Sequence, residues 1–195
     1  MSVLIRFLRY IVTLLIKPFS TIHEIAKDNQ KIIIGLLGLS FITLIYVIAI
    51  STGLIMHNIM PDENTIFLRI PREQYYFYEL FFLFPCALSG TILGSGTVRL
   101  VSMIFVGKGD FETSFALWGF IHIPVAIIMG IPDLIGNWIS ISPVWGWHVW
   151  LGIIVFYICA IISVREVEKL SWIKSILIAL IGYMATGSVQ FIFIR

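Results

Sequence analysis

Charged residues are scarce in this chain of 195 residues, at only 12% of the total, about half their share in an average soluble domain. Cysteine is also rare. Cys86 and Cys159 form no CxxC and join no Cys/His cluster, which excludes a disulfide framework and leaves no sign of a zinc site. The net charge of +2 is too small to indicate a nucleic-acid partner. We therefore expect no nucleic acid, no metal and no cofactor.

Catalytic motifs are missing as well. The chain has no HExxH, no G-x-S-x-G and no P-loop. An intramembrane protease would need a nucleophile and a base, or a metal cluster, within its apolar segments, and no such set can be assembled from the sequence. The sequence therefore predicts a non-enzymatic protein with no catalytic residue.

Apolar residues, by contrast, are abundant, at 59% of the chain, and the mean hydropathy is +0.99. A transmembrane helix needs about 20 mostly apolar residues. Five runs meet this length, at residues 32–56, 77–106, 115–136, 144–164 and 173–194. The predicted fold class is thus an all-α polytopic membrane protein. Residues 1–31 form a cytosolic or interfacial amphipathic segment, and residues 32–195 form a five-helix transmembrane bundle.

The basic residues predict how this bundle is oriented. Cytosolic loops carry an excess of Lys and Arg. In a five-span model, one side holds Arg6, Arg9, Lys17, Lys27, Lys31, Arg99, Lys108, Arg165, Lys169 and Lys174, and the other holds Arg69, Arg72 and Arg195. We expect the N-terminus in the cytosol and the C-terminus outside.

The N-terminal segment has its own pattern. Arg6, Arg9 and Lys17 lie on one helical stripe beside a broad apolar surface. This predicts an interfacial helix whose basic stripe faces lipid phosphates. A signal peptide is the alternative, but no A-x-A-like cleavage site follows the short apolar run. Pro18 should end this helix, and Thr21 to Glu24 has the form of a capping box that would start a second short helix.

Three further stretches carry a family resemblance. They are Lys17-Pro18-Phe19-Ser20-Thr21-Ile22-His23-Glu24-Ile25, Gly107-Lys108-Gly109-Asp110-Phe111 and Gly119-Phe120-Ile121-His122-Ile123-Pro124. In order and spacing they resemble the Yip family, the Ypt/Rab-interacting membrane proteins: a Pro-led start, a glycine-lysine-glycine turn followed by an aromatic residue, and a Gly-aromatic-x-x-x-Pro stretch in the third span.

The resemblance implies a five-helix membrane bundle, often oligomeric, without known catalysis. Eukaryotic members of the family work with small GTPases in vesicle trafficking. This chain lacks their long cytosolic N-terminal tail, so the resemblance points to the prokaryotic branch and to a location in the cell membrane.

A few polar residues lie inside the predicted spans. An ionisable residue there is a candidate functional site by default. The candidates are His122, Asp133, Asn137, His148 and Arg99. His122 is the deepest and would serve in a proton relay, bind a metal or haem, or simply hold a helix hydrogen bond. Asp133 and His148 would pair across the turn between spans three and four or reach the headgroups, and Arg99 would snorkel or contact lipid phosphate.

Small residues and prolines mark the helix contacts. Gly90 and Gly94 form a GxxxG in span two, and Gly182 begins a similar stripe in span five. Such residues let helices approach closely, either within one bundle or at a dimer face. Pro124 and Pro132 should kink span three, because each removes a backbone donor.

Two functions remain. The first is a Yip-like membrane scaffold whose partners are membrane lipids and a second copy of the chain or another membrane protein. The alternative is a small transporter or channel that uses the kinked third helix with His122, Asp133 and Arg99. Transport of a charged substrate normally leaves several polar groups near the midplane. Only His122 lies deep, which favours the scaffold.

Overall fold

The computed structural model describes the chain except residues 1, 56–57, 59, 61–69, 139–146 and 194–195. Two short helices come first. In α1 (Val3–Ile16), the Ser2 side chain caps the N-terminus by accepting from the Ile5 N–H. In α2 (Pro18–Lys27), Pro18 occupies the first turn, where its fixed φ and missing N–H cost least.

The expected capping box is wrong, because α2 begins three residues before Thr21. Thr21 lies inside the helix, where its hydroxyl donates to the Lys17 carbonyl at 3.0 Å. Pro18 therefore ends one helix and starts the next, and the T-x-x-E pattern falls within the second.

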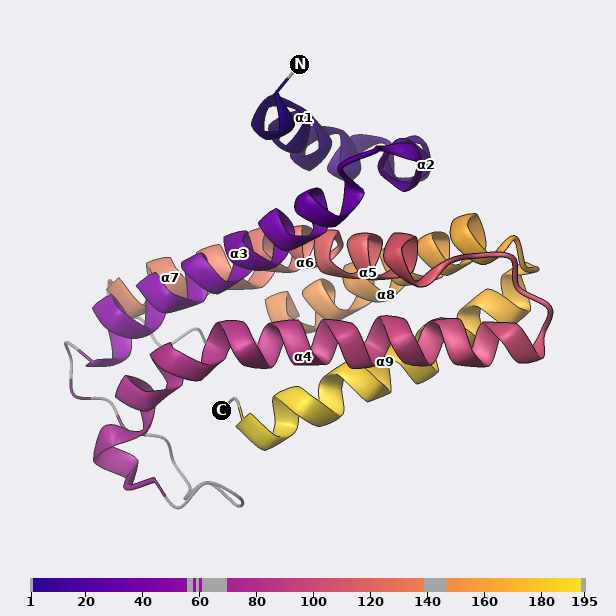
Figure 1. Ribbon diagram of the computed structural model, residues 1–195. Coiled ribbons are helices and arrows are strands. Elements are labelled where there is room, and N and C mark those ends of the chain that lie inside the picture. The colour runs from indigo at the N-terminus through magenta and orange to yellow at the C-terminus, as the bar shows by residue number, and fades with distance from the viewer. Residues whose placement is uncertain (1, 56–57, 59, 61–69, 139–146, 194–195) are drawn as a thin grey trace.

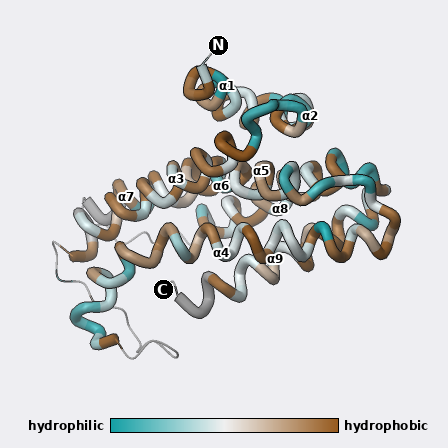
Figure 2. Tube along the Cα trace, viewed as in Figure 1, coloured by the Kyte–Doolittle hydropathy of each residue, from teal (hydrophilic) through white to brown (hydrophobic). Residues whose placement is uncertain are grey.

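Five longer helical segments follow, and each is long and apolar enough to cross a membrane. They are α3 (Lys31–Ala49) continued by the π-helix η1 (Ile50–Ile55); η2 (Arg72–Gln74) with α4 (Tyr75–Ile104); a broken third segment; α8 (Trp147–Glu168); and α9 (Trp172–Phe193). The predicted all-α class with five spans is confirmed. Figure 2 shows the long helices mostly brown, with teal at α2 and at the turn that joins α4 to the third segment.

The third segment is built from α5 (Phe111–Phe120), α6 (His122–Val125), the π-helix η3 (Ala126–Gly130) and α7 (Ile131–Trp138). Pro124 has no N–H to donate to the Phe120 carbonyl, so α5 ends there and a new turn starts at His122. This segment is also the most enclosed, with 67% of its span buried against 28–44% in the others. The irregular helix therefore lies at the centre of the bundle.

The other helices surround this central segment. α3 packs along α5, α4 runs beside α9 and also contacts α5, and α8 contacts α9. α1 and α2 lie on the side of α3, α5 and α6, opposite α4 and α9 (Figure 1). We call the end where α4 and α8 finish the basic end, since Arg99, Lys108, Arg165, Lys169 and Lys174 gather along it.

α1 is anchored to the bundle by one of its faces. Phe7, Tyr10 and Leu14 are buried, and the Phe7 and Tyr10 rings meet Phe120 edge-on at 5.9 and 6.3 Å. An opposite row, which we call the outer row, is more than half exposed and consists of Leu4, Leu8, Val12 and Leu15. α1 therefore holds the bundle with one apolar face and presents a second.

Candidate functional site

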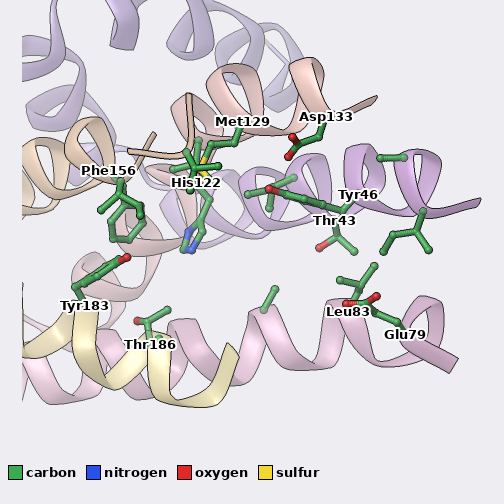
Figure 3. A pocket seen from close by; sticks show the side chains of 18 of the residues that line it. Thr43, Tyr46, Glu79, Leu83, His122, Met129, Asp133, Phe156, Tyr183 and Thr186 are labelled. Atoms are coloured by element: carbon green, nitrogen blue, oxygen red, sulfur yellow. The ribbon is translucent and has the colours of Figure 1, made fainter. Parts of the chain in front are cut away.

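A cavity of about 870 Å³ lies inside the bundle. Its walls come from α3, α4, the third segment, α8 and α9, and Figure 3 shows their side chains converging on it. Most of the lining is apolar. The polar lining residues are Thr43, Tyr46, Glu79, His122, Asp133, Tyr183 and Thr186.

His122 lies beside the break in the third segment. Its Nδ1 is 2.8 Å from the Trp118 carbonyl oxygen. A carbonyl only accepts, so Nδ1 carries the proton, and in the neutral ring Nε2 is left as an acceptor. The ring packs edge-on against Phe156 at 5.0 Å and faces the cavity (Figure 3). Only 5% of the residue is exposed, and none of the described residues donates a hydrogen bond to Nε2.

Asp133 and His148 meet across the cavity wall. Asp133 on α7 accepts from His148 on α8, with 2.9 Å between Oδ1 and Nε2. His148 is buried and Asp133 lines the cavity. The structure thus brings together two of the sequence candidates. Asn137 is a further candidate from the same turn, and its side chain falls outside the described residues.

Glu79 is a cavity residue that the sequence argument missed. It lies one turn into α4, lines the cavity and is only 1% exposed. A signal was present, because Glu79 and Arg99 are the only charged residues in the α4 sequence. Glu79 lies near the start of the predicted span, where a charge is easily assigned to the headgroups.

Arg99 lies elsewhere, at the basic end. Its Nη1 is 2.9 Å from Oε2 of Glu168, whose side chain is fully buried, and it also donates to the Gly107 carbonyl at 3.3 Å. The structure therefore does not bring Arg99 to His122 and Asp133, with which the sequence argument grouped it.

The glycine-lysine-glycine turn wraps around that same Glu168. The Gly109 N–H donates to the Glu168 carboxylate at 3.0 Å, and the Lys108 N–H donates to the Glu168 carbonyl at 3.1 Å. A Cβ on Gly107 would lie 2.5 Å from Glu168 Oε2, and one on Gly109 would lie 2.5 Å from Val167 Cγ1. The turn therefore favours glycine at both positions, since a Cβ would force the Glu168 or Val167 side chain to move.

Asp110 ends this turn and caps α5. Its carboxylate accepts from the Thr113 N–H and hydroxyl, both at 2.8 Å, and lies 3.8 Å from the Lys31 ammonium. Partial burial alone would raise the pKa of Asp110, but the Thr113 hydrogen bonds and the Lys31 charge outweigh it, so the pKa is lowered. Phe111, next in the chain, stacks near Phe115 with ring centroids 6.1 Å apart.

The glycines of the spans also mark helix contacts. Thr186 on α9 accepts from the Trp118 indole at 2.9 Å and donates to the Gly90 carbonyl at 3.1 Å. A Cβ on Gly94 would come within 2.6 Å of Trp118 Nε1, and one on Gly182 within 2.5 Å of Val98 Cγ2. These contacts place the GxxxG against α9 within the bundle.

Gly119 and Pro124 of the family-like stretch are both structural. A Cβ on Gly119 would lie 2.7 Å from the Gly35 carbonyl oxygen, so α3 and α5 touch backbone to backbone here. Pro124 is buried in α6, just past the helix break.

The N-terminal basic stripe contacts α2. Arg6 pairs with Asp28 at 2.9 Å, and Arg9 pairs with Glu24 at 2.9 Å. Lys17 is exposed at the junction of the two helices. The proposed contact with lipid phosphates stays a prediction, and the two arginines also tie α1 to its neighbour.

Within the described part of the chain, no group of three or more His, Cys, Asp or Glu side chains is placed to hold a metal ion. The family model of the Yip1 domain matches residues 12–194, nearly the whole chain. No curated protein and no solved structure matches.

Proposed function

The chain belongs to the Yip1 domain family, and from this premise we propose that it is a non-enzymatic membrane scaffold that organises lipids or a partner membrane protein. The family and the five apolar helices establish the broader statement that it is a multi-pass membrane protein. The scaffold role goes further and rests on one surface of the molecule, the outer row of α1.

The outer row supports a scaffold because α1 cannot rotate to bury these four residues against the bundle. Phe7, Tyr10 and Leu14 already occupy the buried face, and the more buried Arg6–Asp28 pair ties α1 to the end of α2. An apolar helix face that stays exposed is suited to the acyl boundary of a bilayer or to an apolar partner helix. The expected partners are therefore membrane lipids together with a second copy or another membrane protein.

Photocrosslinking tests this role. A photoreactive residue replacing Leu8 in native membranes should give a discrete adduct with a protein or a retained lipid. The matched control replaces Ile154, an exposed residue on α8, and should yield only the diffuse adducts of bulk lipid. The same diffuse pattern at both positions would contradict the scaffold.

We also propose that the basic end and the N-terminus face the cytosol of a prokaryotic cell, with the C-terminus outside, following the bias of Lys and Arg. Labelling tests this in a chain whose Cys86 and Cys159 are changed to Ala. A membrane-impermeant thiol reagent should modify Glu73→Cys in intact cells, and Lys108→Cys only after permeabilisation. Modification of both from the same side would overturn the orientation.

A small transporter or channel is the second candidate, and the cavity is the observation in its favour. It brings together His122, Asp133 and Glu79. Toward the basic end, however, Trp118, Ile121 and Phe156 belong to a buried apolar cluster, so passage would require these side chains to move. A flux assay in proteoliposomes, comparing the natural chain with His122→Ala, tests this candidate directly.

A further inference from the structure

The cavity is large, and most of its lining is apolar. Eleven of its nineteen lining residues have wholly apolar side chains, among them Leu83 and Ile153. A Cβ built on Gly187, at the cavity wall, would meet no atom within 4 Å, whereas one on Gly94 would lie 2.6 Å from Trp118 Nε1. The hollow therefore belongs to one half of the bundle and contrasts with the close packing of the other half.

Two irregular helical segments border this space. Ile50 and Leu54 come from the π-helix η1, and Met129 comes from the π-helix η3. π-helical turns are rare in proteins and occur frequently at functional sites. Two of them beside one cavity indicate that the hollow is a built feature of the fold.

A cavity of this kind needs an occupant. An unfilled apolar cavity destabilises a protein in proportion to its volume. At about 870 Å³, that penalty would exceed the whole free energy of unfolding of a typical domain. The space is therefore filled when the chain is folded in its membrane.

Water is a poor occupant, because a buried water molecule needs about two to four polar partners. Several polar lining groups are already bonded within the bundle. The Thr43 hydroxyl donates to a backbone carbonyl of its own helix at 2.8 Å. Thr186 accepts from the Trp118 indole at 2.9 Å. Asp133 accepts from His148, also at 2.9 Å. Hydrocarbon needs no polar partner, and the surrounding bilayer supplies it.

The size of the cavity suits a lipid tail. An apolar cavity of about 150 Å³ takes one benzene molecule, and on that scale an alkyl chain of about 18 carbons needs roughly three times this volume. The cavity exceeds that, at about 870 Å³. Its lining residues Glu79, Leu83 and Ala87 follow one face of α4 at four-residue spacing, which corresponds to about 12 Å along the helix. The wall therefore extends over two helical turns, as a chain-like occupant requires.

From these observations we infer that the cavity binds the acyl tail of a bilayer lipid. The tail lies among apolar side chains such as Leu83 and Met129, which line the space from different helices (Figure 3). This site is inside the bundle, whereas the proposed scaffold surface is the outer row of α1. The inference therefore goes beyond the scaffold, and it requires no transport.

Photolabelling tests the site. The full chain is placed in phosphatidylcholine nanodiscs that contain a small fraction of phosphatidylcholine with a diazirine in its acyl tail, and mass spectrometry locates the adducts after illumination. Leu83 lines the cavity and is 5% exposed, whereas Ile154 on α8 is 53% exposed. We expect adducts at both residues, because Ile154 reports on the surrounding lipid and Leu83 reports on a tail inside the bundle.

Variants separate these two positions. Ala87→Trp places bulk in the cavity, so it should lower labelling at Leu83 by about tenfold and leave labelling at Ile154 unchanged. Leu93→Trp adds the same bulk to the exposed face of the same helix, and as the matched control it should label like the natural chain. Gly187→Leu fills the cavity from α9 and should also lower labelling at Leu83, which keeps the test available if Ala87→Trp does not fold.

Two further measurements identify the occupant. In a chain whose Cys86 and Cys159 are changed to Ala, Leu83→Cys should resist a membrane-impermeant thiol reagent, whereas Glu73→Cys should react with it. Native mass spectrometry of the chain released from mild detergent should find one retained phospholipid. The Ala87→Trp chain should lose this lipid.

Four results would overturn the inference. They are labelling at Ile154 without labelling at Leu83, unchanged labelling at Leu83 in a folded Ala87→Trp chain, modification of Leu83→Cys by the impermeant reagent, and a retained free fatty acid in place of a phospholipid. Loss of the discrete crosslink at Leu8 concerns only the scaffold, and absence of flux concerns only transport. Failure of tail binding is therefore distinguishable from failure of either proposed function.

Discussion

The basic end and the cavity half of the bundle are made from the same helices, yet they are packed differently. At the basic end, the buried Glu168 is surrounded by Arg99 and the Gly107–Gly109 turn, which leaves no room even for a methyl group. In the other half, Glu79, His122 and Asp133 surround about 870 Å³ of space. At the basic end the buried carboxylate of Glu168 is enclosed by its partners, whereas the polar side chains of the other half line open space.

The largest expected effect tests whether the basic end is held by its ion pair. Arg99→Leu leaves the fully buried Glu168 side chain without its cation and should cost about 3–5 kcal/mol. Unfolding by dodecyl sulfate in mixed micelles measures the loss. Lys108→Leu, an exposed lysine in the adjacent turn, is the control and should stay within about 0.5 kcal/mol. Equal losses of unfolding free energy in the two variants would show that the Arg99–Glu168 ion pair is not what stabilises the basic end.

The next test sets two glycines against each other. Gly94→Ala places a methyl group against Trp118 and Thr186 and should cost about 1–3 kcal/mol. Gly187→Ala meets no atom within 4 Å at the cavity wall, so it should cost nothing and gain up to about 1 kcal/mol from helix propensity. The same unfolding assay applies, and losses of similar size at both positions would argue against the packing difference.

A smaller effect concerns the cap at the basic end. Asp110→Ala removes the α5 cap and should cost about 1 kcal/mol. Because the pKa of Asp110 is lowered in the folded chain, its contribution is present above the ordinary value of 3.8 and is lost as pH falls through the folded value. Comparing the natural chain with Asp110→Asn between about pH 6 and pH 3 measures this. Parallel pH profiles would contradict the lowered pKa.

The smallest effect is expected where α1 meets α2. Arg9 and Glu24 are about half exposed, at 49% and 52%, so their ion pair is screened by solvent. Arg9→Gln should change the free energy of unfolding by less than about 0.5 kcal/mol. A loss of unfolding free energy as large as that of Arg99→Leu would show that the Arg9–Glu24 pair is also shielded from solvent. The basic end would then not differ from the α1–α2 contact in the strength of its ion pair.

Much of the fold could be predicted from the sequence. The predicted runs 77–106 and 173–194 agree with α4 and α9 to within about two residues at each end. The short η2 turn before α4 was not predicted. Pro124 also indicated where the third segment would break. Proline lacks the N–H that would bond within its own helix, so this effect depends only on the local sequence. The capping box failed for a related reason, since Pro18 was already a suitable first residue for α2.

The site was harder to predict. Asp133 and His148 are separated by a short connection, so their meeting was foreseeable as one of two alternatives. Glu79 comes from a different helix and was missed. Arg99 was grouped with the wrong residues, because sequence position does not reveal that Glu168, 69 residues later, lies beside it.

The sequence by itself determined that this chain has five helices long and apolar enough to cross a membrane. The length of an apolar run is a local property, and bilayer thickness converts it directly into a span. Only the tertiary structure decided which polar groups meet. The rotation of each helix depends on close backbone contacts such as Gly35 against Gly119 and Gly94 against Trp118, which join segments far apart in the chain. In the assembled bundle Glu168 is buried at one end, and Glu79, His122 and Asp133 line a common cavity at the other.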